Sequence, residues 1–286
     1  MTCAPYSPHD YKSDLKPVWC PGCGDFAVLN SVYRALAELH FEPHETVIVS
    51  GIGCSSRLPG YVETYGFNSL HGRALPIATG VKLAAPNLNV IAVGGDGDGI
   101  AIGGNHFMHA ARRNADIAYL MMDNEIYGLT KGQAGPTTPR GDKTKSTTYG
   151  NPDTGVDPCA LAISLGASWV GRGFAGDVKG TTELMKLAIR HHGFAFLNII
   201  SPCVTWRGDD QIKLLRPRVR AVADDHVRSD REAAMRLTNE EEEKITVGVL
   251  YEDARPTLLD EMIEIRERAS GEKMPPTRSE ILAAFG

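Results

Sequence analysis

The chain has 286 residues and a formal net charge of −5 at pH 7, so its charge does not favour a nucleic-acid-binding face. No apolar run approaches the length of a membrane span, and the N-terminus lacks the apolar core of a secretory signal, so we expect a cytoplasmic protein without a membrane segment. The length allows a single domain with a large core. Six cysteines in such a chain point to metal binding or catalysis before disulfides.

Apolar periodicity predicts helices that alternate with strands along most of the chain. Helical spacing predicts helices at residues 25–39, 75–85, 100–113 and 177–191. Short apolar and β-branched runs predict strands at 46–50, 89–93, 117–122, 168–170 and 194–200. Residues 127–157 are rich in Gly, Pro, Thr and Lys, which indicates a long functional loop, and Asp157 and Pro158 then read as the start of a helix. The alternation predicts an α/β fold, with a mainly parallel sheet and helices on both faces.

The composition shifts at about residue 216, where charged runs become frequent and strand-like runs are scarce. We therefore divide the chain into a domain of residues 1–215 and a C-terminal extension of residues 216–286. The extension is expected to consist of helices and irregular turns packed outside the sheet or onto a partner. The acidic run at 240–244 is interpreted as a solvated helix start.

Two polar motifs lie about thirty residues apart, Gly94-Gly-Asp-Gly-Asp-Gly99 and Met121-Met-Asp-Asn124. Asp96 and Asn124 offer hard oxygen ligands to Mg²⁺, and the glycines allow a diphosphate to approach the backbone at a helix N-terminus. The pair resembles the signature of thiamine-diphosphate enzymes. A glycine-rich turn between a strand and a helix, without a ligand, is the alternative.

Chemically useful side chains follow four of the predicted strands. Cys54, Asp96, Asn124 and Cys203 each come shortly after a strand ends. Ligands of open α/β sheets collect beyond the carboxyl ends of the strands, so these groups are expected at one edge.

The cysteines at that edge suggest a metal centre. Cys20 and Cys23 form a Cys-Pro-Gly-Cys turn, which alone is compatible with an iron-sulfur cluster, zinc, a redox disulfide or no ligand. With Cys54 and Cys203 the set holds four thiols, which suits either a [4Fe–4S] cluster or zinc. Cys3 and Cys159 are interpreted as unligated.

Five motifs occur in an order that resembles one known family. They are Trp19-Cys-Pro-Gly-Cys-Gly24, Gly51-Ile-Gly-Cys-Ser55, His71-Gly-Arg-Ala-Leu-Pro-Ile-Ala-Thr-Gly80, Gly95-Asp-Gly-Asp98 and Asp123-Asn-Glu-Ile-Tyr-Gly-Leu-Thr-Lys-Gly-Gln133. Together they resemble the β subunit of 2-oxoacid:ferredoxin oxidoreductases over roughly residues 15 to 215. The resemblance implies thiamine diphosphate, Mg²⁺ and one [4Fe–4S] cluster in this chain. It also implies a partner α subunit, coenzyme A and ferredoxin, in an (αβ)₂ assembly.

The resemblance also implies roles for individual residues. Cys20, Cys23, Cys54 and Cys203 would ligate the cluster, and Asp96, Asn124 and the backbone carbonyl of Ile126 would ligate Mg²⁺. The cofactor would be lined by Gly53, Cys54, Ser55, Ser56, His71, Gly95, Asp96, Gly97, Asp98, Asn124, Leu129 and Thr130. Asp98 repels a diphosphate by charge, so we expect it to accept backbone hydrogen bonds or to order water. For His71, a place at a helix entry, held by local hydrogen bonds, is an equal alternative to a place beside the cofactor.

The implied reaction is a coenzyme A-dependent oxidative decarboxylation, reversible in principle, whose electron sink is the thiamine ring. Arg57 and Lys131 are candidates, with His71, for catalytic groups that meet an anionic substrate. Two cations favour the dicarboxylate 2-oxoglutarate over pyruvate. The glutamate that thiamine enzymes use against the aminopyrimidine is expected on the α subunit, so the isolated chain should be inactive. A subunit with a structural Cys₄ zinc site, or a thiamine decarboxylase without an electron-transfer centre, remains the alternative.

Overall fold

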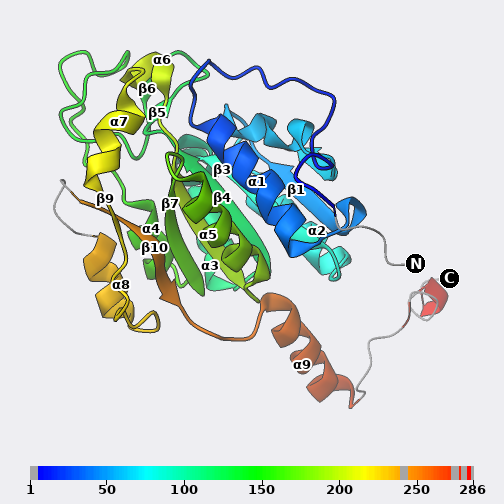
Figure 1. The fold of residues 1–286 in the computed structure, drawn as a ribbon. Helices are drawn as coiled ribbons and strands as arrows, with labels where there is room; N and C mark the ends of the chain where they lie inside the picture. Colours follow the sequence, from blue (N-terminus) through cyan, green and yellow to red (C-terminus); the bar gives the residue numbers. More distant parts are fainter. Residues whose placement is uncertain (1–5, 239–243, 272–276, 278–281, 285–286) are drawn as a thin grey trace.

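A single large sheet forms the centre of the computed structural model, which describes residues 6–238, 244–271, 277 and 282–284 (Figure 1). Its strands follow the order β2 (Tyr65–Asn68), β1 (Thr46–Ser50), β3 (Asn89–Gly95), β4 (Ile117–Asp123), β8 (Phe194–Ile200), β7 (Trp169–Phe174), β10 (Ile245–Glu252) and β9 (Val219–Ala221). The strands from β2 to β7 are parallel to one another, and β10 joins β7 in the antiparallel direction.

Helices cover both faces of this sheet. The helices α1 (Asp25–Leu39) and α5 (Val178–Arg190) lie side by side on one face, as Figure 1 shows. The other face is covered by α2 (Ala74–Ala84), α3 (Gly104–Arg112), α4 (Pro158–Ser164) and α8 (Arg231–Thr238). In β4, Leu120 and Met122 pack toward α1 and α5, whereas Tyr119 and Met121 pack toward the opposite helices. A strand buried on both faces is therefore apolar at every position, and its carboxyl end carries the first polar groups.

Short elements fill the connections. They are η1 (Pro43–Glu45), η2 (Ser55–Tyr61), the π-helical turn η3 (Gly97–Ile102), β5 (Ile126–Tyr127), β6 (Gln133–Ala134), α6 (Val204–Arg207), α7 (Gln211–Leu215) and η4 (Arg216–Arg218). The helix α9 (Leu258–Ser270) projects from the body of the molecule (Figure 1). No helix among the described residues is both long enough and apolar enough to cross a membrane.

The predicted α/β fold is confirmed, and the strands at 46–50 and 194–200 have the predicted bounds. The helix predicted at 100–113 is wrong at its start, because the chain turns as a π-helix from Gly97 and is interrupted at Gly103 before α3 begins. There the N–H of Gly103 donates to the carbonyl of Asp98, and a side chain at Gly103 would meet that carbonyl at 2.7 Å.

The prediction that the C-terminal extension lies outside the sheet is wrong. Residues 245–252 form β10, which pairs with β7, and β9 pairs with β10 in turn. Val249 and Leu250 are buried there, so part of the extension completes the sheet. The boundary between residues 215 and 216 stays a prediction. Cys3 and most of the acidic run, residues 240–243, lie outside the described residues.

Candidate active site

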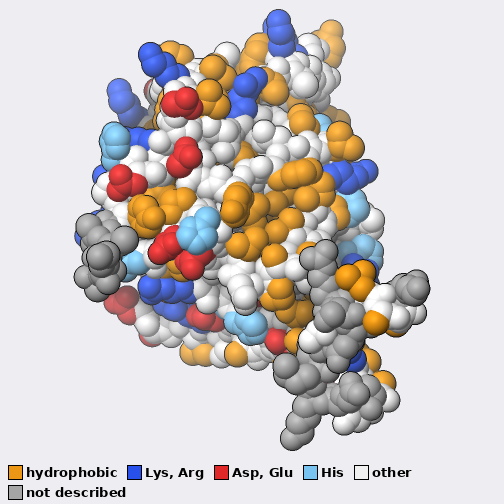
Figure 2. Space-filling view, turned by 90° about the vertical axis from the view of Figure 1, so that its right-hand side faces the viewer, with side chains coloured by type: hydrophobic (Ala, Val, Ile, Leu, Met, Phe, Trp, Pro, Cys, Tyr) orange, Lys and Arg blue, Asp and Glu red, His pale blue; other side chains and the backbone are white. Residues whose placement is uncertain are grey.

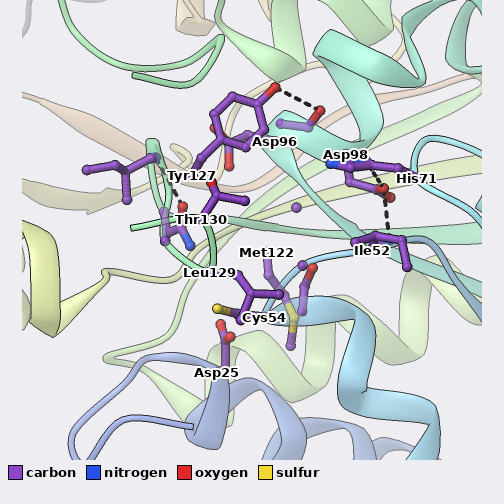
Figure 3. A pocket seen from close by; sticks show the side chains of 17 residues that line it. Asp25, Ile52, Cys54, His71, Asp96, Asp98, Met122, Tyr127, Leu129 and Thr130 are labelled. Carbon is purple, nitrogen blue, oxygen red and sulfur yellow. Dashed lines mark hydrogen bonds and ion pairs between the residues drawn. The ribbon is translucent and has the colours of Figure 1, made fainter. Parts of the chain in front are cut away.

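A cavity opens at the carboxyl ends of β1, β3 and β4 (Figure 3). Its lining includes all but one of the residues that the sequence assigned to the cofactor: Gly53, Cys54, Ser55, His71, Gly95, Asp96, Gly97, Asp98, Asn124, Leu129 and Thr130. Ile126 also lines the cavity. Ser56 is buried and is not part of the lining; its carbonyl accepts a hydrogen bond from Ser50 instead. Parallel strands thus bring together residues that are far apart in the sequence.

The turn after β3 is packed so closely that its glycines cannot be replaced. A Cβ atom at Gly97 would lie 2.2 Å from the ring of Tyr127, and one at Gly99 would lie 1.9 Å from the Tyr119 hydroxyl. The hydroxyl of Tyr127 donates to the carbonyl of Gly97 over 3.3 Å. At Gly97 the missing side chain makes room for the ring of Tyr127, which packs directly against the backbone of this turn.

Asp98 ties three turns of the site together rather than facing a ligand. Its Oδ1 accepts hydrogen bonds from the N–H of Ile52 at 3.0 Å and of Gly72 at 2.8 Å, as expected from the sequence. The Nδ1 of His71 lies 2.8 Å from the same oxygen (Figure 3). Burial raises the pKa of Asp98, and these contacts oppose the rise. The two alternatives for His71 were local hydrogen bonds and a place beside the cofactor. Its contact with Asp98 is local, and its side chain also lines the cavity.

Asp96 is a buried carboxyl group that lacks a cationic side chain among its interactions. Thr137 donates its hydroxyl toward Oδ2 of Asp96 at 2.8 Å and lies 2.9 Å from Oδ1 of Asp123. Burial, followed by the charge of Asp123, raises the pKa of Asp96 to about 8. A divalent cation would offset this cost, because it favours the ionised carboxylate.

Asn124 and Ile126 complete an oxygen-rich set with Asp96. Both line the cavity next to it, and Oδ1 of Asn124 accepts a hydrogen bond from the N–H of Ile126 at 3.1 Å. Carboxylate, amide and backbone carbonyl oxygens are the ligands that Mg²⁺ takes in proteins. These residues therefore fit a magnesium-diphosphate group.

The four predicted cysteine ligands gather beside this cavity. A Cβ atom at Gly128 would lie 3.5 Å from Sγ of Cys203 and 3.9 Å from Sγ of Cys54. Cys20 and Cys23 lie in one tight turn, and the charges of Cys54 and Cys203 contribute to the raised pKa of Cys23 after burial.

Burial makes the thiols of Cys23, Cys54 and Cys203 costly to ionise without a metal, because it raises the pKa of each. Burial raises the pKa of Cys54 to about 11, and Asp25 and Cys203 add to the rise. A metal centre stabilises thiolates and so offsets this cost. Within the described part of the chain, no three His, Cys, Asp or Glu side chains are placed to hold a single metal ion.

Cys159 lies elsewhere, on the buried side of α4, in the hydrophobic cluster on the opposite face of the sheet. Its Sγ faces the carbonyl of Gly171 at 3.7 Å. That Cys159 is unligated stays a prediction.

The structure does not bring Arg57 and Lys131 into the lining, and both side chains are exposed. Arg57 lies close enough to Cys54 for its charge to oppose the rise in the pKa of that thiol. The backbone of Lys131 is left-handed, with φ of +81°. Both cations therefore lie outside the cavity formed by this chain alone.

Sequence reasoning missed five lining residues: Asp25, Ile52, Met122, Tyr127 and Gly128. Asp25 accepts a hydrogen bond from Ser201 at 2.7 Å, and burial raises its pKa to about 6. Its position, two residues after Cys23 at a helix start, was the available signal for it. Tyr127 and Gly128 lie within the quoted family motif but were not assigned a role.

Comparisons with known proteins agree with this geometry. Residues 51–199 match the family model "Thiamine pyrophosphate enzyme, C-terminal TPP binding domain", and residues 203–267 match the model for the C-terminal part of the pyruvate ferredoxin oxidoreductase β chain. A solved 2-oxoglutarate:ferredoxin oxidoreductase from Magnetococcus marinus, with 2-oxoglutarate, coenzyme A and succinyl-CoA bound, has a similar chain. The TM-score is 0.91 and the identity 43%, over 98% of this chain and 96% of that one.

Several relatives are similar in sequence. The β subunit of 2-oxoacid:ferredoxin oxidoreductase 1 from Aeropyrum pernix is 40% identical over 93% of this chain and 87% of its own length. The β subunit of 2-oxoacid:ferredoxin oxidoreductase 2 from the same organism is 50% identical over 69% of this chain, and the alignment spans 64% of that relative. The 2-oxoglutarate synthase subunit KorB of Methanocaldococcus jannaschii is 37% identical over 90% of this chain and 96% of its own length. This chain belongs to the family of 2-oxoacid:ferredoxin oxidoreductase β subunits.

Proposed function

We propose that this chain is the thiamine-diphosphate-binding β subunit of a coenzyme A-acylating 2-oxoglutarate:ferredoxin oxidoreductase. One observation carries the proposal: the cavity that holds Asp96, Asn124 and Ile126 also contains Cys54, and Cys203 lies against its wall at Gly128. A diphosphate site and a group of cysteines next to each other suit decarboxylation coupled to electron transfer.

In this proposal each group of residues has one task. Asp96, Asn124 and the carbonyl of Ile126 hold Mg²⁺, and Gly95 and Gly97 leave room for the diphosphate. The cysteines Cys20, Cys23, Cys54 and Cys203 hold a [4Fe–4S] cluster. Bound thiamine diphosphate supplies a carbon nucleophile and an electron sink for 2-oxoacid decarboxylation, and the cluster supplies one-electron transfer.

The remaining residues of the chain orient these ligands and exclude water. Asp98 fixes the turns that carry Ile52 and Gly72, and Thr137 fixes the carboxyl group of Asp96. Leu129, which is 50% exposed, lies at the cavity and leaves an apolar surface there for a partner or a substrate.

The names of the relatives support the proposed substrate. The solved M. marinus enzyme has 2-oxoglutarate, coenzyme A and succinyl-CoA bound, and several relatives are named 2-oxoglutarate synthase subunits. Arg57 and Lys131 supply cations outside the cavity for the distal carboxylate of such a substrate. We infer a cytoplasmic (αβ)₂ enzyme. Its pyrimidine-binding domain lies on the α subunit, and its electrons pass to ferredoxin.

An anaerobic assay with the α subunit, coenzyme A, ferredoxin and a panel of 2-oxoacids tests this proposal. We expect coenzyme A-dependent ferredoxin reduction with 2-oxoglutarate, and weaker reduction with pyruvate. A preference for pyruvate would overturn the substrate assignment. Decarboxylation without ferredoxin reduction, by a colourless protein, would overturn the electron-transfer assignment.

A further inference from the structure

The short helix α6 connects the cysteine group to the loop that carries the magnesium ligands. It begins directly after Cys203, and the N–H of Arg207 donates to the carbonyl of Cys203 at 3.0 Å. From the same turn, Nε1 of Trp206 donates to the carbonyl of Gly128 at 2.9 Å. Nη2 of Arg207 lies 2.8 Å from Oε2 of Glu125. One helical turn thus contacts the loop after β4 at two points.

In that loop, Glu125 has a backbone conformation that is strained for a residue with a side chain. Its backbone is left-handed, with φ of +58°, although it is not a glycine. Such a conformation is unfavourable for a residue with a Cβ atom and persists only where the surroundings enforce it. Glu125 lies between Asn124 and Ile126, and Oδ1 of Asn124 bonds the N–H of Ile126 across it. The left-handed turn therefore decides where both of these proposed magnesium ligands point.

Arg207 is well suited to enforce this turn. Its side chain is only 18% exposed, and Nη2 also lies 2.8 Å from Oδ2 of Asp142, in the long loop that crosses the site. Nη2 of Arg207 thus holds two carboxylates at once, and the planar guanidinium fixes the direction of its donors more tightly than a flexible ammonium does. Arg207 does not line this cavity, and its ion pair with Glu125 is a contact through which it reaches the proposed ligands.

We propose that Arg207 is a positioning residue for the diphosphate site, and that it acts by holding Glu125 in its left-handed turn. This inference rests on the proposed function, because it assumes that Asn124 and Ile126 bind Mg²⁺. The contacts that carry it are the ion pairs of Arg207, the φ angle of Glu125 and the bond between Asn124 and Ile126.

The test measures Mg²⁺-dependent thiamine diphosphate binding by calorimetry in the complex of the full chain with its α subunit. The variants are Arg207→Gln and Arg207→Lys. Arg228→Gln is the matched control. Arg228 also forms an ion pair with a glutamate, but this pair is exposed: it joins Arg228 to Glu252, at the end of β10, over 3.5 Å. Each variant is also assayed for iron content and for turnover at saturating cofactor.

We expect Arg207→Gln to weaken cofactor binding about tenfold, as is typical when a residue that orients a metal ligand is removed. Turnover at saturating cofactor and iron content should stay near wild type, because Arg207 touches no reacting atom. Arg207→Lys should lose less, and Arg228→Gln should match the wild type. Loss of iron in parallel with cofactor affinity would show a general structural role and would overturn the proposal.

A second variant, Glu125→Asn, tests whether the effect of Arg207 depends on the turn at Glu125. Asparagine adopts left-handed backbone readily, so Glu125→Asn removes both the strain and the ion pair. In that background the further change Arg207→Gln should have almost no effect on cofactor binding. An equal loss in both backgrounds would overturn the proposal, as would wild-type affinity in Arg207→Gln. Should Arg207→Gln fail to fold, the same comparison with Arg207→Lys decides. Absence of thiamine diphosphate binding in the wild type would instead refute the proposed function.

Discussion

The hydroxyl of Thr137 faces two buried carboxyl groups, those of Asp96 and Asp123, but has only one hydrogen to donate. The second carboxyl group therefore needs a proton or a cation nearby, and burial raises the pKa of Asp123 as it does that of Asp96. Asn198 and the N–H of Glu125 already bond Asp123, whereas Asp96 faces the cavity. Asp96 is thus the member of the pair that is free to meet a metal ion.

At the same scale, the cysteine assignment predicts that Cys54→Ala and Cys159→Ala differ. Cys54 lies at the cavity among the other cysteines. Cys159 lies on the buried side of α4, on the opposite face of the sheet. Anaerobically purified Cys54→Ala should lose its iron and its brown colour, because a cluster with three thiolates is held weakly. Cys159→Ala should keep both. Iron analysis and visible absorption check this, and equal behaviour of the two variants would refute the ligand assignment.

The sequence predicted those residues whose place depends on the ends of strands. Cys54, Asp96, Asn124 and Cys203 follow strands whose apolar runs are easy to recognise, and the parallel sheet brings them to one edge. Thr137 and Tyr127 were missed because they reach the site through a loop. Hydrophobic periodicity carries no information about the path of such a loop.

At the scale of elements, the strand β10 was not predicted from the sequence. Its run of Ile, Thr, Val, Leu and Tyr is strand-like, but it follows a charged stretch that favoured an irregular extension. Gly248, with φ of +136°, and a register shift between Val249 and Tyr251 break its alternation. The strand forms because β7 would otherwise leave a buried, apolar edge without hydrogen-bond partners.

The start of α4 gives a prediction at this scale, because Asp157 has two tasks there. Its side chain accepts the N–H of Ala160 at 2.8 Å as the helix cap, and it pairs with the buried guanidinium of Arg172. Asp157→Asn keeps an acceptor for the cap but leaves Arg172 buried and unpaired, which should cost about 3–5 kcal/mol of unfolding free energy. Asp157→Ala should cost about 1 kcal/mol more, because the cap is also lost.

Urea unfolding of the two variants and the wild type measures these costs. Equal stability of Asp157→Asn and Asp157→Ala would show that the cap contributes nothing. A wild-type free energy of unfolding in Asp157→Asn would show that the ion pair with Arg172 does not stabilise the fold.

At the scale of the whole molecule, apolar surface remains uncovered at the β2 edge of the sheet. Tyr65 and Phe67 in β2 are 57% and 49% exposed, and Leu70, next to His71 of the cavity, is 75% exposed. Figure 2 views the molecule from this side and shows hydrophobic side chains gathered across the centre of the face. Apolar surface of this kind marks a protein interface, and it agrees with a β subunit whose site is completed by another chain.

This incompleteness leads to the prediction that the isolated chain does not turn over 2-oxoacids. The side-chain carboxylates that line the cavity are those of Asp25, Asp96 and Asp98, and each already bonds a protein group: Ser201, Thr137, or the backbone of Ile52 and Gly72. Among the described residues that line the cavity, none is a glutamate, and we propose that the glutamate that activates the aminopyrimidine comes from the partner.

The chain alone should therefore bind Mg²⁺ and thiamine diphosphate, keep its iron and yet show no ferredoxin reduction with 2-oxoglutarate. Addition of the α subunit should restore turnover without a change in iron content. Binding by calorimetry and an anaerobic assay on the same preparation separate the two properties. Turnover by the chain alone would mean that a residue of this chain forms the ylid. The first residue to replace would then be Asp25, because its carboxyl group lines the cavity beside the cysteines.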